Sequence, residues 1–294
     1  MAVEGEVVAL PMSPVVAAWE LALRLRQRRD HMGVEVKTIT QALGFSRNYW
    51  SAVENERKIL SEESLIKLLE LFEFDQEERN ELLELRRFAK EHGWWTRYAA
   101  LLDGELQRLM GLEYGAQSVR DYESLLVPGL LQTADYARAI MTPDVTMRQV
   151  EVDQRVEVRL RRQSRLTDDD PLQMTAIISE AVLRQELGGP AVLKRQLAHI
   201  VNMVEEHPDT IEVRVLPFTV TACGLFGAAT VHLIDFESPR LPTVFWQETV
   251  TTWGVVDDPV QVRDIVMTYR EALGRALSTS DSVKMIHRRI KEIS

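Results

Sequence analysis

Apolar residues recur at three- and four-residue intervals through the N-terminal part of the chain, which is the spacing of one buried helix face. Ser46, Ser61 and Asp75 stand where such stretches begin, and these residue types favour helix N-caps. The pattern predicts five helices: three at residues 16–29, 46–54 and 62–72, one before Gly44 that buries Val36, Ile39, Thr40 and Leu43, and a fifth following residue 75. Together they would form a complete small bundle.

The second and third of these helices are joined by a tight turn at Gly44, a residue suited to positive φ. The third helix would bury Trp50 and Val53 at i, i+3 spacing. Its outward-facing side chains are polar: Arg47, Asn48, Tyr49 and Ser51. Exposed hydrogen-bonding groups at the start of a helix, braced by a second helix, are typical of a major-groove reader. The sequence therefore predicts a DNA-binding helix-turn-helix.

The pattern changes after the loop at residues 167–171. Residues 96–166 are expected to be helical, with helices at 97–109, from Leu112 to about Asp121 and at 131–141, and an arginine-rich helix from Met147 to Leu166. Beyond the loop, alternating and apolar stretches predict strands at 172–179, 211–216, 228–236, 243–250 and 253–256. Further helices are expected at 180–187, 191–207, 259–277 and 282–290.

These elements predict a fold that is mainly α with a smaller mixed α+β part. We expect a flexible arm at residues 1–15 and a helix-turn-helix domain at residues 16–92. The remainder, residues 93–294, would be a signal-receiving and dimerisation domain that is helical over 96–166 and α+β with a small sheet over 172–294.

Composition narrows the class of protein. The chain of 294 residues carries a net charge of −10, but residues 16–60 hold eight basic residues against five acidic ones. A local positive patch on an acidic protein suits specific DNA binding. The single cysteine, Cys223, fits a reducing cytoplasm, and no apolar run approaches the roughly 20 residues of a membrane span. Glu4 and Glu6 argue against an export signal.

The segment SRNYWSAVENERK resembles the recognition helix and following turn of the XRE family of helix-turn-helix proteins. Two positions depart from the family pattern: Glu56 stands where Gly is favoured, and Val36 where a phosphate-binding Gln is common. VPGLLQTADYARA, EAVLRQELGGP and VFWQETVTTW are similar to the C-terminal domain of many actinobacterial XRE regulators, the WhiJ-like class. This resemblance implies a regulator of development or secondary metabolism, in some cases encoded beside a small acidic partner protein.

The candidate DNA-binding residues come from the helix-turn-helix. They are Lys37, Ser46, Arg47, Asn48, Tyr49, Ser51, Asn55, Arg57 and Lys58. Arg47 and Asn48 are placed to read bases, and Arg57 and Lys58 to hold backbone phosphates. The expected partner is a double-stranded operator with two-fold symmetry, bound by a homodimer.

A second candidate site, for a small-molecule effector or partner protein, lies around the predicted sheet. It comprises Phe218, Phe226, Trp246, Glu248 and Trp253. Catalysis is not expected, because the histidines are scattered and neither a metal-binding motif nor a phosphate-binding loop is present; no cofactor is predicted. In the arginine-rich helix, Val156 and Leu160 would be buried and the arginines solvated or paired. The main alternative is an antitoxin-like interaction module whose helix-turn-helix binds DNA weakly or not at all.

Overall fold

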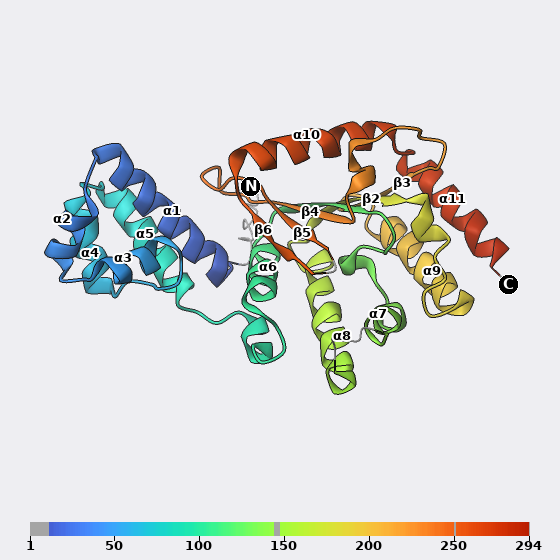
Figure 1. The fold of residues 1–294 in the computed structure, drawn as a ribbon, viewed down its shortest axis with the longest axis horizontal. Coiled ribbons are helices and arrows are strands. Elements are labelled where there is room, and N and C mark those ends of the chain that lie inside the picture. Colours follow the sequence, from blue (N-terminus) through green and yellow to red (C-terminus); the bar gives the residue numbers. More distant parts are fainter. Residues whose placement is uncertain (1–11, 144–147, 250, 294) are drawn as a thin grey trace, which may run out of the picture. The chain divides into compact units, whose positions relative to one another are not determined.

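The computed structural model describes residues 12–143, 148–249 and 251–293, which divide into two compact units at residues 12–96 and 97–293. The N-terminal unit is a bundle of five α-helices (Figure 1). They are α1 (Pro14–Met32), α2 (Val36–Leu43), α3 (Arg47–Glu54), α4 (Glu62–Leu71) and α5 (Gln76–Ala89). Most of the arm predicted at residues 1–15 lies outside the described residues.

The predicted caps of this bundle are confirmed. The side chains of Ser46, Ser61 and Asp75 each accept a hydrogen bond from the backbone N–H three residues later, which satisfies one of the free donors at a helix start. Gly44 ends α2 with φ of 69°. The core beneath the helices is aliphatic and aromatic, with Ile39, Leu65, Leu68 and Phe72 fully enclosed.

The C-terminal unit combines six strands with further helices. Its α-helices are α6 (Gly104–Tyr114), α7 (Ala134–Met141), α8 (Gln149–Gln163), α9 (Pro190–Glu206), α10 (Pro259–Arg275) and α11 (Thr279–Glu292). Its strands are β1 (Ser118–Glu123), β2 (Gln173–Ser179), β3 (Ile211–Leu216), β4 (Thr230–Asp235), β5 (Val244–Glu248) and β6 (Trp253–Val256). Short 3-10 turns connect them: η1 (Trp94–Tyr98), η2 (Gly129–Leu131), η3 (Ser164–Leu166), η4 (Glu180–Leu183) and η5 (Gly224–Gly227).

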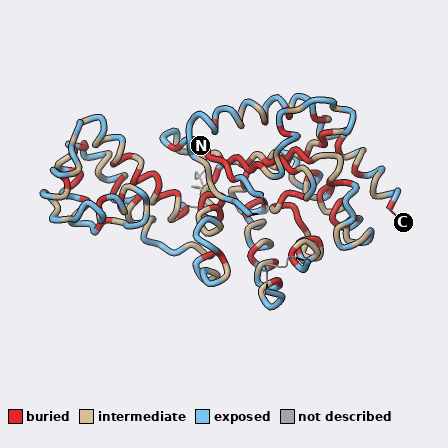
Figure 2. The backbone as a smooth tube through the Cα atoms, in the orientation of Figure 1, coloured by how far each residue is buried: buried red, intermediate tan, exposed pale blue. Residues whose placement is uncertain are grey.

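The strands form one mixed sheet in the order β3-β2-β1-β4-β5-β6. β1, β2 and β3 are parallel, whereas β4, β5 and β6 follow as an antiparallel meander. α10 covers one face, and α6, α7, α8 and α9 lie on the other (Figure 1). The sheet is the buried centre of the unit (Figure 2). The fold class, mainly α with a smaller α+β part, is as predicted.

The helix predicted from Leu112 to about Asp121 is wrong. α6 ends at Tyr114, and β1 runs through Ser118–Glu123 in the interior of the sheet, between β2 and β4. Three of the six residues of β1 are charged, a composition unusual for a buried strand, and this concealed its alternation. Ion pairs within the unit compensate these charges, such as the two hydrogen bonds of 2.9 Å from Arg120 to Asp235.

Three other helical predictions need correction. Residues 180–187 form only the 3-10 turn η4 before Arg184, because the chain leaves β2 into a tight connection. Residues 131–141 are divided between η2 and α7. The first helix of the C-terminal unit begins at Gly104, not near Arg97, because Asp103 caps it by accepting from the N–H of Leu106 at 2.8 Å. Leu160, predicted buried, is 40% exposed.

No helix in the described parts of the chain combines the length and the apolar character needed to cross a membrane.

Candidate DNA-binding surface and charged cavity

The second helix of the helix-turn-helix, α3, is fixed by its cap and by its apolar face. The Ser46 hydroxyl accepts from the Tyr49 N–H at 3.1 Å, and Trp50 and Val53 are 1% and 4% exposed in the bundle core. Because these two residues anchor one side of the helix, Arg47, Asn48 and Ser51 project from the other. All three are exposed. The helix therefore presents a polar face on a rigid support.

The structure places the predicted DNA-binding residues on α3, on the neighbouring α2 and in the turn after α3. Eight of the nine are exposed, and Tyr49 is half-buried. Tyr49 stacks on Phe45, with ring centroids 4.3 Å apart, and the Lys58 ammonium lies 4.8 Å from the centre of its ring. The Asn55 amide donates to the Ser51 carbonyl at 2.6 Å. Lys58 and Asn55 are thus held against α3 by contacts within the unit.

The cations of this unit fall into two groups. Arg24, Arg28 and Arg29 are used internally: Arg24 pairs with Glu81 at 2.8 Å, Arg28 donates to the Phe72 carbonyl at 2.8 Å, and Arg29 pairs with Glu54 at 2.8 Å. The second group is exposed and forms no ion pair with any residue that the structure describes. It comprises Lys37, Arg47, Arg57, Lys58 and, at the end of α5, Lys90. Four of these five cations lie on α2, α3 and the turn after them.

That turn has a left-handed residue where the resembled family favours glycine. Glu56 has φ of 62°, a conformation that glycine adopts without cost and other residues adopt with strain. The turn geometry is kept in this chain even though the residue type is not. Val36, the other departure, is half-buried against the bundle core.

In the C-terminal unit, strand register places polar side chains in two adjacent rows on one face of the sheet. Asp121 pairs with His232, and His232 with Trp246. One step along, Glu123 pairs with Thr230, and Thr230 pairs with Glu248. Because alternate strand residues share a face, all six side chains lie on the side of the sheet away from α10.

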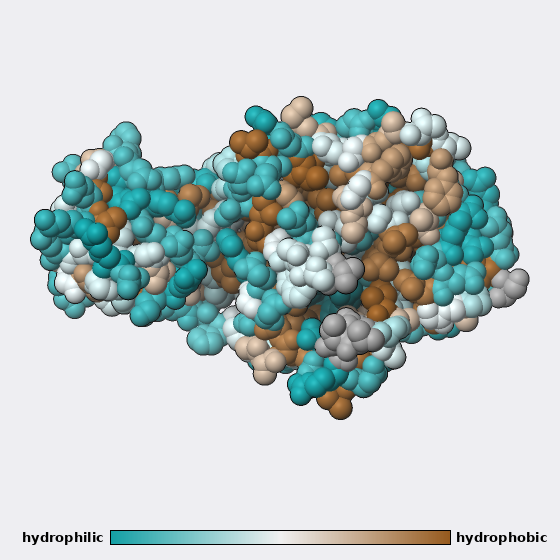
Figure 3. Space-filling model, viewed as in Figure 1, coloured by the Kyte–Doolittle hydropathy of each residue, from teal (hydrophilic) through white to brown (hydrophobic). Residues whose placement is uncertain are grey.

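A cavity of about 280 Å³ lies over these rows. Helix α8 contributes Arg155, Val158, Arg159 and Arg162, which share one helix face at i, i+3 and i+4 spacing. Other parts of the wall are apolar and come from α6, α7 and the loops near η2: Leu102, Leu106, Leu109, Met110, Leu126, Leu130, Ile140 and Met141. The side of the molecule that carries α7 and α8 shows hydrophobic residues gathered on the C-terminal unit (Figure 3).

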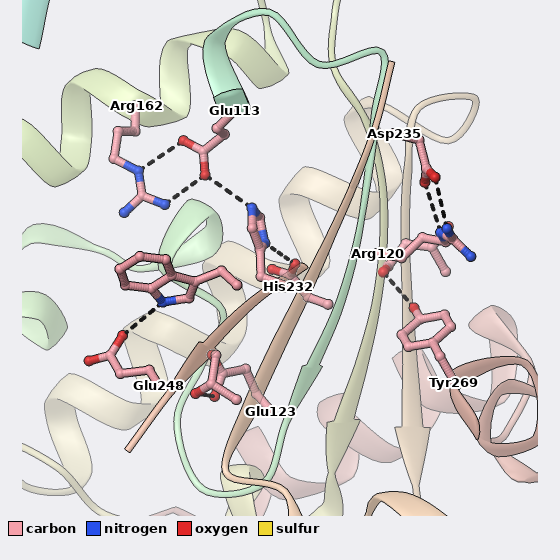
Figure 4. A network of polar contacts seen from close by, with 12 residues as sticks. Glu113, Arg120, Glu123, Arg162, His232, Asp235, Glu248 and Tyr269 are labelled. Carbon is pink, nitrogen blue, oxygen red and sulfur yellow. Dashed lines mark hydrogen bonds and ion pairs between the residues drawn. The ribbon is translucent and has the colours of Figure 1, made fainter. Parts of the chain in front are cut away.

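A chain of buried charges runs beside the cavity (Figure 4). Arg162 donates to both carboxylate oxygens of Glu113, from Nε at 2.8 Å and from Nη2 at 2.6 Å. His232 lies between two carboxylates, with Nε2 3.4 Å from Glu113 Oε2 and Nδ1 in a short contact with Asp121. Asp121, Glu113 and His232 are all less than 9% exposed. The network ties α6, α8, β1 and β4 together.

These contacts shift the pKa values in opposite directions. Burial by itself would raise the pKa of Glu113, but Arg162, followed by His232, lowers it to about 2. Burial opposes the charged form of His232, yet Asp121 and then Glu113 raise its pKa to about 10. Glu113 is therefore ionised and His232 protonated at neutral pH. Each buried charge has an opposite charge beside it.

Two other groups at the cavity are less well compensated. Burial and then Asp121 and Glu248 raise the pKa of Glu123 well above 4.5, although Thr230 donates to it at 3.0 Å. Burial, followed by the charge of Arg162, lowers the pKa of Arg159 to about 10. Arg159 has one hydrogen bond, from Nη1 to Gln132 Oε1 at 2.6 Å.

The predicted effector-site residues are not brought together. Trp246 and Glu248 line the cavity, and the Trp246 indole donates to Glu248 at 3.3 Å. Phe218 and Phe226 are 59% and 51% exposed, and Phe226 belongs to η5, which packs on α10 at the other face of the sheet. Trp253 is 41% exposed, and its indole donates to Asp103 at 3.0 Å.

Sequence reasoning missed Asp121, Glu123, Arg159 and His232 as cavity residues. The available signal was the two-residue spacing of Asp121 and Glu123 within a strand, and that strand was interpreted as a helix. No group of His, Cys, Asp and Glu in the described part of the chain has an arrangement that could hold a metal ion.

Comparison with protein families assigns both units. Residues 106–288 match a family described as a domain of unknown function, DUF5753. Residues 20–82 match a helix-turn-helix domain. No curated protein and no solved structure matches the chain.

Proposed function

This protein belongs to the family defined by the domain of unknown function DUF5753, which spans most of its C-terminal unit, and we propose that it is a sequence-specific transcriptional regulator. Its N-terminal helix-turn-helix indicates a DNA-binding regulator. In the proposal, α3 enters the major groove and the C-terminal unit receives a signal. The single observation that carries the DNA-reading role is the set of exposed cations around α3 that lack ion-pair partners among the described residues.

Within this proposal the exposed residues divide by their chemistry. Arg47 and Asn48 stand at the N-terminal end of α3, and both side chains can form paired hydrogen bonds with a base edge. Lys37, Arg57 and Lys58 flank the helix and would neutralise backbone phosphates. Ser46 is occupied as the cap, so its contribution would be to position the start of α3.

The finer features of the proposal follow from the resemblance to XRE-type regulators. We propose a homodimer on a two-fold operator, with half-sites about one helical turn apart, acting in the cytoplasm where the DNA is. We further propose an actinobacterial role in development or secondary metabolism. The C-terminal unit is assigned dimerisation and signal reception by a small-molecule effector or a small acidic partner protein, and it is assigned no catalytic reaction.

The competing function is an antitoxin-like interaction module with a helix-turn-helix that has lost DNA binding. Val36 and Glu56 favoured this alternative in the sequence. The left-handed backbone at Glu56 weakens it, because the turn after α3 keeps the conformation that glycine would give. Val36 packs against the bundle core, so its presence does not remove any of the exposed cations.

Genome-wide DNA capture with the purified full-length chain, followed by a salt titration on any recovered site, tests the proposal. We expect a recurrent two-fold motif whose binding falls steeply with salt.

A matched pair of double variants tests whether the DNA-binding surface lies around α3. Arg47→Gln/Lys58→Gln should abolish enrichment, whereas Lys67→Gln/Arg87→Gln removes the same charge from exposed sites of the same unit and should not. Failure of the native chain to enrich any sequence at low salt would favour the partner-binding alternative.

A further inference from the structure

The cavity in the C-terminal unit is large enough for a compact organic molecule. Its volume of about 280 Å³ is near the lower end of small-molecule sites, roughly 300–1,000 Å³. It would hold roughly nine water molecules at about 30 Å³ each. Much of the wall is apolar, with Leu106, Leu109, Met110 and Leu130 among its residues. Charged side chains such as Arg159 and Arg162 form the other part of the wall, so a compact molecule with an apolar body and a charged group fits it.

One cation of the cavity has no ion-pair partner. Arg162 is neutralised by Glu113, and His232 lies between Asp121 and Glu113. Arg159 lines the same cavity and donates a hydrogen bond to a neutral amide oxygen, that of Gln132. No carboxylate among the described residues lies within ion-pair distance of Arg159.

Gln132 sets the position of Arg159. The Gln132 amide donates to the Val127 carbonyl at 2.6 Å, and its oxygen accepts from Arg159 Nη1 at 2.6 Å. The remaining N–H groups of Arg159 form no hydrogen bond with any residue that the structure describes.

The acidic residues of the cavity do not supply the missing negative charge. Asp121 is engaged by His232, and Glu248 is exposed and accepts from Trp246. Glu123 is buried beside Asp121, and burial together with that neighbouring charge raises its pKa. Burial and the neighbouring charge therefore favour the protonated form of Glu123, which can donate a hydrogen bond to an anion.

We propose that this cavity binds a small organic acid, an apolar molecule with one carboxylate that pairs with the Arg159 guanidinium. The carboxylate would supply the anion that the half-buried Arg159 lacks, and the apolar body would pack between α6, α7 and the Trp246 indole. A buried charge is stabilised strongly by such pairing. That this ligand is the signal of a regulator rests on the proposed function. The binding of the acid itself does not involve DNA.

Calorimetric titration of the full-length chain with three probes of similar shape tests the ligand class. Benzoate is the anion, benzamide its neutral analogue and benzylamine the cation. We expect benzoate to bind at least about tenfold more tightly than benzamide, with benzylamine weakest, because charge-assisted hydrogen bonds form only with the anion. Equal or stronger binding of benzamide or benzylamine, or no benzoate binding in the millimolar range, overturns the proposal.

A pair of variants on α8 locates the binding site. Arg159→Met keeps the length of the side chain and removes its charge, and it should abolish the preference for benzoate over benzamide. Arg161→Met is the control, because Arg161 is an exposed neighbour on the same helix and does not line the cavity. Retention of the benzoate preference in Arg159→Met would overturn the assignment. If that variant does not fold, the probe series on the native chain still decides the ligand class.

The two proposals fail separately. Recovery of an operator without benzoate binding would contradict the ligand assignment and support the role as a regulator. Benzoate binding without any DNA enrichment sinks the regulator and leaves an acid-binding protein.

Discussion

The two units use basic side chains in opposite ways. On the helix-turn-helix, Lys37, Arg47, Arg57 and Lys58 stand in solvent without ion-pair partners among the described residues. In the C-terminal unit, Arg162 and His232 are enclosed, and carboxylates lie against both. Exposed charges without partners cost little and remain free to meet a polyanion. Buried charges persist only with partners in place. The difference shows that the surroundings of each cation, more than the number of cations, distinguish a binding surface from a structural network.

The largest effect is expected from removing the carboxylate at the centre of the buried network. Glu113→Gln leaves Arg162 without its bidentate partner and removes one of the two anions beside His232. Breaking a buried pair in this way costs about 3–5 kcal/mol of unfolding free energy. Chemical denaturation of the C-terminal unit, followed by a probe of its tertiary structure, measures the loss.

The control for this change is Glu157→Gln. Glu157 pairs with Arg97 at 3.0 Å, but both side chains are more than half exposed. Surface pairs of this kind contribute about 1 kcal/mol or less. Similar losses for the two variants would show that the Glu113 network has no special structural role and would remove the contrast between the two units.

The fold of the N-terminal unit was predicted from the sequence more accurately than that of the C-terminal unit. The helix-turn-helix depends on local signals: caps at Ser46, Ser61 and Asp75 lie next to the helices they start, and Gly44 specifies its own turn. Such signals are visible within a few residues. The exposure of Arg47 and Asn48 follows from the same helical period that buries Trp50.

The cavity depends on long-range pairing that no local pattern contains. Asp121 and His232 are 111 residues apart in sequence and become neighbours only through the register of β1 and β4. A strand as charged as β1 is favourable only once its partners are present, so its composition by itself does not indicate a buried strand. The strands β3 and β6, whose bounds were predicted as observed, have fewer charged residues or none.

Alkaline pH should weaken the buried network. His232 has a pKa of about 10 when folded, against 6.5 when unfolded. Its contribution is therefore complete below pH 6.5 and is lost as the pH rises through 10. Within that window folding takes up one proton, so the unfolding free energy falls by at most about 1.4 kcal/mol per pH unit.

Denaturation at a series of pH values measures this slope for the native chain and for His232→Gln. Asp121 and Glu113 lie against the imidazole, and the pKa of Glu113 is held at about 2, so the difference between the two slopes reports His232 itself. Identical slopes would mean that His232 does not hold its proton in the folded state.

At the DNA-binding surface, single substitutions should affect binding and not folding. Arg47→Ala should cost about 1–3 kcal/mol on the specific site and relax base preference, because a bidentate base contact is lost. Lys58→Ala should weaken binding to all DNA about equally and reduce the salt slope by about one. Titrations on specific and random duplexes at several salt concentrations separate the two. Equal effects of both variants on both duplexes would contradict the assignment of Arg47 to base reading.

The smallest effect is expected at the turn after α3. Glu56→Gly removes the strain of a left-handed residue with a side chain, which costs about 1–2 kcal/mol, but the glycine also gains freedom in the unfolded chain. The net result should be a gain of up to about 1 kcal/mol in unfolding free energy of the N-terminal unit. Glu84→Gly in the middle of α5 is the control and should lose about 1 kcal/mol, because that position is helical. A loss at Glu56 of the same size would mean that contacts of its side chain outweigh backbone strain, and that this chain has adapted the turn to a residue other than glycine.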